Sequence, residues 1–527
     1  MLFNSYAFIF GFLPIALLGY QIAAHFHRRA VVAWLAVASM AFYAYWRPAF
    51  LLLLLGSVLF NYGLSLLISR RIPTEISTRL LLWLGIAGNL AALCYCKYLF
   101  PLLNWTAHAA HSNTHWDDVL LPLGISFFTF TQIAYLVDLQ EGSAQQQDFP
   151  SYCLFVTFFP HLIAGPILHH AEMMPQFQQD RDYRLRMNDL AIGSSWFIMG
   201  LCKKVIIADQ FSKAANAAYR APGHLSFLSS WSGVLSYALQ LYFDFSGYSD
   251  MALGLARMFS IDFPLNFSSP YKAASIIDFW QRWHMTLTRY INVYIYNPAS
   301  FAINRRRLAK GKKVSRKAFS TPAGFLDMVV APTMLTLLLA GIWHGAGLQF
   351  AIFGILHGLY LSINHAWLIF RQPPKIETQT AFRRHVRHVQ GVLLTFGAVL
   401  VGQVFFRALS TSDAMAMLGG MIGLHGFGSL GGSLTAPGGT LAGGYRVTLR
   451  DCAEIVIGFI IVWGFPNTQQ ILLKFKPALE VTKADLEARL LPIFWNPTAG
   501  WAVGLGAAFF AALIRLQDPS TFLYFQF

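Results

Sequence analysis

Long apolar runs dominate the hydrophobic pattern of the chain, and short polar segments separate them. A helix needs roughly 20 mostly apolar residues to cross a bilayer. By this measure the pattern predicts about twelve membrane spans. Their approximate ranges are 6–24, 30–46, 49–69, 80–103, 119–137, 190–208, 227–245, 324–343, 346–370, 390–408, 453–471 and 498–516. We therefore predict an all-α polytopic membrane protein that forms a single membrane-embedded domain over residues 1–527.

Two apolar regions, residues 155–170 and 244–300, contain helix-breaking residues and do not read as single straight spans. Broken backbone is tolerated at membrane depth only where protein buries it or where it lines water. We expect both regions to be re-entrant segments. Their breakers are Pro160, Pro166, Gly247, Pro264, Pro270 and Pro298.

The composition agrees with a membrane protein. Of the 527 residues, 56% are hydrophobic and 12% are charged, and the mean hydropathy is +0.48, which is too apolar for an ordinary soluble protein. The net charge is +15, but the lysines and arginines cluster in short loops, as the positive-inside rule describes. We therefore expect no nucleic-acid partner.

The basic loops predict one orientation. Arg28–Arg29 and Arg70–Arg79 are separated by two spans, and so are Arg305–Lys317 and Arg371–His388. One assignment therefore puts all four on the cytoplasmic side and the N-terminus outside. The first run, Tyr6–Ala24, has no basic region before it, so we expect a retained span and not a signal peptide.

Several other features carry little functional information. The five cysteines lie in or beside apolar segments without metal-ligand spacing, so no disulfide framework is expected. The Gly-rich segment 412–444 is expected to be an external loop, more simply a linker than a lid. The sequence holds no internal repeat, serine nucleophile elbow, phosphate loop or dinucleotide fingerprint.

The most informative polar stretch is DFWQRWHMTLTRY, Asp278–Tyr290, which places ionisable side chains among apolar runs. Such groups are costly at membrane depth and are tolerated where they line a cavity or pathway. Read as one helix, the stretch has an aromatic face and a basic face, with Asp278 one turn before Arg282. The aromatic face holds Trp280, Trp283, His284 and Leu287, and the basic face holds Arg282, Thr286 and Arg289.

A second histidine, His344 in the motif GIWHGAG, ends the apolar run Pro332–Trp343. A neutral imidazole suits proton abstraction near neutral pH, and the flanking glycines Gly341, Gly345 and Gly347 let backbone or a ligand approach closely. Taken singly, each histidine also fits a helix-end or core role. Taken together, His284 and His344 lead us to expect one buried site, served by tunnels from both membrane faces.

Acidic residues fall in a third stretch, YFDFSGYSDMA, which begins at Tyr242. Asp244 and Asp250, with Tyr248 between them, are candidates for the tunnel wall. The carboxylates could bind a cation, orient a histidine or pair with Arg257 or Arg282, and a structural ion pair is the simplest of these. No metal site is predicted, because the close histidine pairs lie in expected loops. These pairs are His111 with His115 and His385 with His388.

These motifs resemble those of the membrane-bound O-acyltransferase family, and within it the bacterial alginate O-acetyltransferase type. The similarity runs in the same order over nearly the whole chain. Arg289–Ser300 departs from it, because this stretch lacks the acidic residue and the glycine pair of alginate-type members. The matching motifs are FPHLIAGPI (159–167), KKVIIAD (203–209), QLYFDFSGYSDMALGLARM (240–258), DFWQRWHMTL (278–287), GIWHGAG (341–347), VFFRA (404–408) and YFQF (524–527).

The resemblance implies a ring of about 11–12 transmembrane helices around a thinned centre, in a bacterial cytoplasmic (inner) membrane. It also implies that His344 takes the proton from an acceptor hydroxyl, or from a carrier group on a partner. His284, with Arg282 or a nearby hydroxyl, would hydrogen-bond the oxyanion or orient the donor. The residues expected along the donor and acceptor tunnel are Asp244, Tyr248, Asp250, Trp280, Arg282, Trp283 and Trp343.

The resemblance further implies no bound cofactor, acetyl-CoA as the donor substrate, an esterase-like O-acetyltransferase partner outside the cytoplasm, and a polysaccharide acceptor. Alginate, cellulose, another exopolysaccharide and peptidoglycan are the candidate acceptors. The basic run Arg305–Lys317 would attract the phosphates of CoA. The alternatives are D-alanyl transfer from a carrier thioester to a cell-wall polymer, a transporter or channel, and a scaffold for polysaccharide export.

Overall fold

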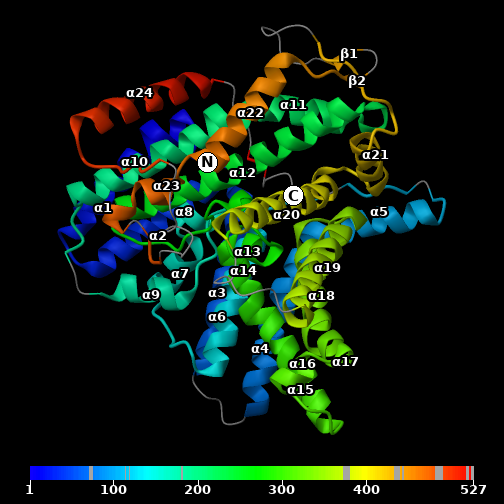
Figure 1. Cartoon of the computed structure of the whole chain (residues 1–527). Helices are drawn as coiled ribbons and strands as arrows, with labels where there is room; N and C mark the ends of the chain where they lie inside the picture. The colour runs from blue at the N-terminus through cyan, green and yellow to red at the C-terminus, as the bar shows by residue number, and fades with distance from the viewer. Residues whose placement is uncertain are drawn as a thin grey trace.

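The fold is almost entirely helical (Figure 1). The computed structural model describes residues 1–69, 75–112, 114–117, 119–179, 182–371, 380–431, 440–441, 444–476, 478–480, 491–517 and 522–523. The basic residues Arg70 and Arg71 and the terminal YFQF motif lie outside the described residues.

The elements follow one another in three groups, in which η marks π-helical or 3₁₀ segments. The first group is η1 (Ala7–Phe12), α1 (Leu13–Ala24), α2 (Arg28–Ala44), α3 (Pro48–Ser69), α4 (Glu75–Cys94), η2 (Tyr95–Leu99), α5 (Phe100–Ala109), α6 (Ile125–Glu141), α7 (Phe149–Thr157), α8 (Phe159–Leu162) and α9 (His170–Gln178). The second is α10 (Met187–Cys202), η3 (Lys203–Ala208), α11 (Asp209–Arg220), η4 (Pro222–His224), α12 (Phe227–Met258), η5 (Pro270–Lys272), α13 (Ile276–Trp280), α14 (Met285–Ile291) and η6 (Asn292–Tyr296). The third is α15 (Asn297–Ala309), α16 (Arg316–Phe319), α17 (Pro322–Phe325), η7 (Leu326–Val330), α18 (Ala331–His344), α19 (Leu348–Phe370), α20 (Ala381–Arg407), α21 (Thr411–Met421), β1 (Thr440–Leu441), β2 (Gly444–Tyr445), α22 (Leu449–Gly464), α23 (Thr468–Ile471), η9 (Leu473–Phe475) and α24 (Ala499–Arg515).

Seven helices in the described part of the chain are long and apolar enough to cross a membrane, which confirms a multi-pass membrane protein. The predicted number of about twelve counted shorter helices as well: α2, α6 and α24 have 17 residues and α22 has 16. The helix α12 is long, but it carries serines and aspartates among its apolar residues. The seven are Ala7–Ala24, Pro48–Ser69, Ser77–Ala109, Met187–Arg220, Pro322–His344, Leu348–Phe370 and Ala381–Arg407.

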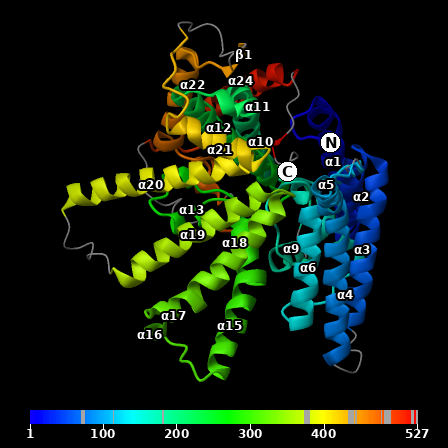
Figure 2. The ribbon, with the colours of Figure 1, turned by 90° about the vertical axis from the view of Figure 1, so that its right-hand side faces the viewer.

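Two groups of helices extend toward the same end of the molecule. Figure 2 shows α3, α4 and α6 side by side in one group, with α15, α18 and α19 in the other. The beginning of α4 and the basic end of α15 lie at this common end in both views. This arrangement agrees with the predicted placement of both basic loops on one side of the membrane.

The central element is α12, in which residues 236–256 are all buried. It packs closely against α10, because glycines on the two helices face one another. A Cβ atom at Gly200 would lie 2.7 Å from the carbonyl oxygen of Gly247, and one at Gly193 would lie 2.6 Å from that of Gly254. The prediction that Gly247 interrupts the helix is therefore wrong, since this glycine allows backbone contact between two intact helices.

The aspartates of α12 form buried ion pairs with η3. Lys204 Nζ lies 2.6 Å from an Asp244 carboxylate oxygen and 2.9 Å from Asp209, and Lys203 pairs with Asp250. Of the roles that the sequence left open, ion pairing is the one observed, but the partners are lysines and not Arg257 or Arg282. Near the chain end, the Leu523 amide also donates to the Asp244 carboxylate at 3.0 Å.

The region 244–300 is interrupted at fewer places than predicted. The chain leaves regular helix between α12 and α13, where Pro264 and Pro270 lie, and again between α13 and α14. The helix is continuous across Pro298, which follows the π-helical segment η6 directly and lies near the start of α15. The earlier region, 155–170, does break as predicted, between α7 and α8 and again after α8. Entry and exit of these segments on one membrane face stays a prediction.

The Gly-rich segment 412–444 is not a simple loop. Its first part belongs to the helix α21. Near its end, the two-residue strands β1 and β2 pair with each other, with Thr440 opposite Tyr445 and Leu441 opposite Gly444. Residues 432–439, 442 and 443 lie outside the described residues.

The ion pairs of α12 lead to a prediction about stability. Lys204→Met leaves the Asp244 carboxylate buried without its lysine, which should destabilise the protein by about 3–5 kcal/mol. Thermal unfolding of the detergent-purified protein measures this effect. Lys213→Met, at an exposed position on α11, is the matched control and should leave the melting temperature unchanged; an equal loss in both variants would contradict the prediction.

Candidate active site

His284 lies in a sharp turn between two short helices and not within one helix as predicted. Its φ of 43° and ψ of 53° are left-handed, a conformation that costs a non-glycine residue of order 1–3 kcal/mol. Two backbone bonds stabilise the turn against the preceding segment: Ser268 N to Arg282 O and Met285 N to Asn266 O, both 2.9 Å. His284 therefore does not lie on the face of a regular helix.

The ring of His284 is oriented by Asn266. His284 Nδ1 lies 3.0 Å from Asn266 Oδ1. The same Oδ1 accepts from the Thr286 backbone amide at 3.4 Å, which identifies this atom as the oxygen, because a backbone N–H can only donate. His284 therefore donates from Nδ1, and Nε2 carries the lone pair in the neutral ring.

The predicted basic face is divided between separate sites. Arg282 bonds Asp278 at 2.7 Å, as the one-turn spacing indicated. Arg289 instead pairs with Glu172, with one bond of 2.8 Å. Thr286 is a structural link, since its hydroxyl bonds Asn266 and accepts from the Ile167 amide at 3.0 Å.

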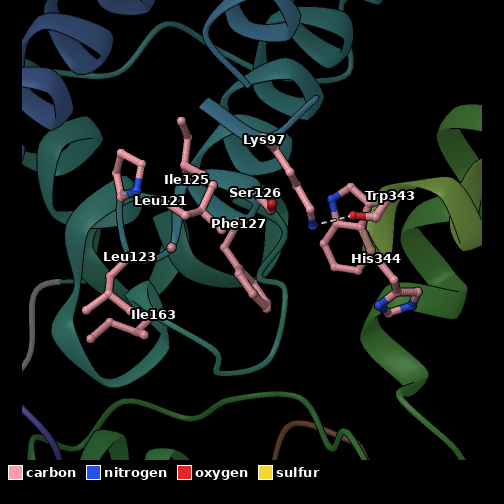
Figure 3. Close-up of a pocket in the computed structure, with 11 residues that line it drawn as sticks. Lys97, Leu121, Leu123, Ile125, Ser126, Phe127, Ile163, Trp343 and His344 are labelled. Atoms are coloured by element: carbon pink, nitrogen blue, oxygen red, sulfur yellow. Dashed lines mark hydrogen bonds between the residues drawn. The ribbon is translucent and has the colours of Figure 1, made fainter. Parts of the chain in front are cut away.

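His344 is the last residue of α18, and the helix end is stabilised by side chains from η2 (Figure 3). Lys97 Nζ donates to the Trp343 carbonyl at 2.6 Å, and the Tyr98 hydroxyl donates to the Ile342 carbonyl at 3.0 Å. Carbonyls at a helix C-terminus lack partners within the helix and attract cations. These contacts fix the position from which the imidazole projects.

The glycines around His344 allow the close approach that the sequence indicated. A Cβ atom at Gly341 would lie 2.4 Å from the Phe350 carbonyl oxygen and 2.9 Å from the backbone of Gly354. The helices α18 and α19 therefore meet backbone to backbone directly before the histidine.

The structure brings His284 and His344 together in the wall of one cavity, although 60 positions separate them in the chain. The cavity volume is about 40 Å³, room for a group the size of an acetyl unit or a few waters. Trp280 and Trp283, both expected at the site, also line it. The remaining lining residues are Leu241, Phe245, Phe279, Leu287, Phe353, His357, Val399, Gln403 and Phe406.

His344 also borders a second cavity of about 60 Å³, which contains Lys97 and Trp343 (Figure 3). A third cavity, of about 210 Å³, lies against α14 and is lined by Thr286 and Arg289. Whether these spaces connect the histidines to both membrane faces stays a prediction.

Several polar atoms in the histidine cavity have no hydrogen-bond partner among the described residues. They are Trp280 Nε1, Gln403 Oε1 and both ring nitrogens of His357. A buried polar group without a partner costs free energy, so each one needs an explanation. The polar groups of a bound substrate would satisfy these atoms, because a substrate oxygen can accept from Trp280 Nε1 and a substrate hydroxyl can donate to Gln403 Oε1.

Five residues expected along the tunnel do not line the histidine cavity, and one of them, Trp343, lines the second cavity beside His344. Asp244, Asp250 and Arg282 are engaged in the ion pairs described above. Tyr248 stacks with Phe3, ring centroids 4.9 Å apart.

Sequence reasoning missed Asn266, Lys97, His357 and Gln403. Each lies in an apolar or irregular stretch without a motif of its own. The only sequence signal was a polar residue at membrane depth, which many structural residues share.

Comparison with known proteins finds relatives over most of the chain. The membrane-bound O-acyltransferase family model matches residues 77–313, a range that includes His284 and ends before His344. The peptidoglycan O-acetyltransferase of Helicobacter pylori is 38% identical over 458 residues, which cover 81% of this chain and 80% of that protein. The probable alginate O-acetylase AlgI of Pseudomonas putida is 34% identical over 540 residues and the full length of both chains. The teichoic acid D-alanyltransferase of Streptococcus thermophilus is 26% identical over 295 residues, 54% of this chain and 68% of that protein.

The chain therefore belongs to the membrane-bound O-acyltransferase family and is a polytopic acyltransferase. The resemblance inferred from the motifs is confirmed. Family membership argues against a transporter or a pure scaffold.

The orientation of His284 by Asn266 can be tested by substitution. Asn266→Ala should lower kcat for acyl transfer by about tenfold or more, because a ring without its partner adopts the wrong tautomer or orientation. The measurement is turnover of the purified protein with a thioester donor. Ser249→Ala is the matched control, since it removes only the bond from the Asn266 Nδ2 group; equal kcat values for both variants and the parent would contradict the assignment.

Proposed function

We propose that the protein is a membrane-bound O-acetyltransferase of a bacterial cytoplasmic (inner) membrane. It moves an acetyl group from the cytoplasmic thioester acetyl-CoA toward a hydroxyl of an extracytoplasmic polysaccharide, through an esterase-like partner transferase. The observation that carries this proposal is the buried, mostly apolar cavity whose wall contains both His284 and His344. A dry site of this kind limits loss of the thioester to water.

In the proposed reaction His344 acts as the general base. It takes the proton of the acceptor hydroxyl as that oxygen attacks the thioester carbonyl carbon. The carbon–sulfur bond of the tetrahedral intermediate then breaks, and the proton passes from the imidazolium to the departing thiolate of CoA. The products are an acetyl ester and free CoA, and the histidine returns to its neutral form.

The oxyanion is assigned to Trp280 and not to His284 with Arg282. Neutral His284 donates from Nδ1 to Asn266, so its Nε2 carries no hydrogen that it could donate to an oxyanion. Arg282 pairs with Asp278 and does not line the cavity. The Trp280 indole N–H lines the cavity without a partner among the described residues, which suits an oxyanion.

The names of the relatives support a glycan acceptor. The relatives from Helicobacter pylori and Pseudomonas putida, each over 30% identical across most of the chain, are named peptidoglycan O-acetyltransferase and probable alginate O-acetylase. The D-alanyltransferase match covers about half of this chain at 26% identity. We therefore favour acetyl transfer to a glycan over D-alanyl transfer.

Removing the base tests the mechanism. His344→Ala should lower transfer from acetyl-CoA by at least about 100-fold while the protein stays folded, because general-base catalysis contributes that much. The assay follows radiolabelled acetyl transfer by the protein in vesicles, and size-exclusion chromatography follows folding. His365→Ala on α19, outside the cavity, should retain full activity. Transfer by the His344→Ala protein at the parent rate would contradict the assignment.

Removing the indole N–H tests the oxyanion assignment. Trp280→Phe keeps an aromatic ring but no donor, and kcat should fall by about 100-fold with little change in KM. Trp231→Phe removes an indole N–H that bonds the Met421 carbonyl, far from the histidines in the chain, and should leave kcat unchanged. An unchanged kcat for Trp280→Phe would return the oxyanion role to another group.

Donor choice separates the two acyl chemistries. The purified protein should consume acetyl-CoA, and a D-alanyl carrier thioester should not replace it. Mass spectrometry of extracytoplasmic glycan from cells with and without the protein should then show loss of acetyl esters. Transfer of D-alanine and not acetyl would overturn the proposed donor.

A further inference from the structure

A second cluster of ionisable side chains lies apart from the histidine cavity, where α6, α9 and η6 meet. Asp138 comes from the end of α6, His169 and His170 from the start of α9, and Tyr294 from η6. One ligand atom from each of Asp138, His169 and His170 lies within 4.8 Å of the others. The residues come from segments up to 156 positions apart, so the fold and not local sequence creates the cluster.

We propose that Asp138, His169 and His170 bind a divalent transition-metal ion of the zinc class. Two imidazoles and one carboxylate form a donor set typical of Zn²⁺ and its neighbours, whereas Ca²⁺ and Mg²⁺ prefer oxygen ligands alone.

The spacing of the donor atoms fits coordination of one ion. The Asp138 Oδ2 atom lies 3.0 Å from His169 Nε2 and 3.1 Å from His170 Nδ1. Zinc lies about 2.0–2.2 Å from nitrogen and oxygen ligands, so two ligands at right or tetrahedral angles are about 3–3.5 Å apart. The carboxylate oxygen therefore lies at a suitable distance from each imidazole nitrogen for one ion, and the two nitrogens lie within 4.8 Å of one another.

One buried ring nitrogen of the cluster makes no hydrogen bond among the described residues. Asp138 accepts from Tyr294 at 2.6 Å, and His169 Nε2 lies 2.8 Å from the same hydroxyl. His170 Nδ1, in a residue only 7% exposed, makes no hydrogen bond within the described residues despite its nearness to the carboxylate. Burial of such an atom is costly, and coordination of a metal explains its position.

Binding at His169 Nε2 has a small cost. The ring hydrogen must then sit on Nδ1, which gives up the long 3.3 Å bond that it accepts from the Ala171 amide at the start of α9. One long hydrogen bond is weak beside a metal–imidazole bond.

Three protein ligands leave coordination positions for other groups. The cavity of about 210 Å³ that contains Arg289 is lined by His169 and Tyr294 as well. A water from this cavity, or the Tyr294 oxygen, completes the coordination. The ion would thus join α6 to the start of α9, and with water as the further ligand it keeps an accessible position, the arrangement of sites that bind an exchangeable ligand.

Metal content of the full-length protein tests the proposal. The protein is purified with a tag that contains no histidines, stripped with a chelator, loaded with Zn²⁺ and freed of excess metal by gel filtration. Mass spectrometry should then find one equivalent of zinc per chain. Zn²⁺ should also raise the melting temperature, because the ion binds the folded state.

Three variants and one control locate the ion. Asp138→Asn, His169→Gln and His170→Gln should each weaken zinc binding at least tenfold and abolish the thermal shift. His385→Gln combined with His388→Gln removes an exposed histidine pair on α20 and should retain one equivalent.

Binding of no zinc by the parent, or retention of the full equivalent by the cluster variants, would overturn the proposal and leave a hydrogen-bonded cluster. Should a buried substitution prevent folding, His169→Gln decides, because its side chain is 30% exposed. X-ray absorption of the zinc-loaded parent adds an independent readout, since it should show imidazole ligands, and a shell without them would also contradict the site.

Discussion

The structure depends on one constraint: broken backbone in a dry interior must find its hydrogen bonds within the protein. The segment between α12 and α13 is irregular and almost wholly buried. It meets this constraint by bonding the turn that follows α13, through the backbone at Ser268 and Asn266. The turn and the segment therefore stabilise one another.

The segment that carries these hydrogen bonds also orients the imidazole of His284. Asn266 satisfies the backbone of Thr286 and at the same time selects the tautomer of His284, so positioning of the fold and of the imidazole cannot be separated. The end of α18 follows the same principle, because Lys97 compensates a carbonyl that the helix leaves open beside His344. Polar side chains that hydrogen-bond to otherwise unpaired backbone groups thus also position the residues of the site.

Polar residues elsewhere in the apolar interior serve packing. The glycine pairs of α10 and α12 bring the two backbones together, and the continuation of α10 into η3 then places Lys203 and Lys204 beside Asp250 and Asp244. Removal of charges from water is costly unless they are paired. An aspartate at membrane depth is therefore no evidence of catalysis until its partner is known.

The sequence by itself determined the class of protein, because polar groups are costly in lipid and a membrane-spanning segment must therefore be a long apolar run. It also singled out His284, His344, Trp280 and Trp283 as candidate site residues, because they stand in distinctive motifs, and all four line one cavity in the structure. Tertiary structure decided the rest. Whether a glycine breaks a helix or packs against another, as Gly247 does, depends on its neighbour across the interface. The partners in the ion pairs and the members of the cavity wall, such as His357, come from distant segments, and no local pattern encodes a contact of that range.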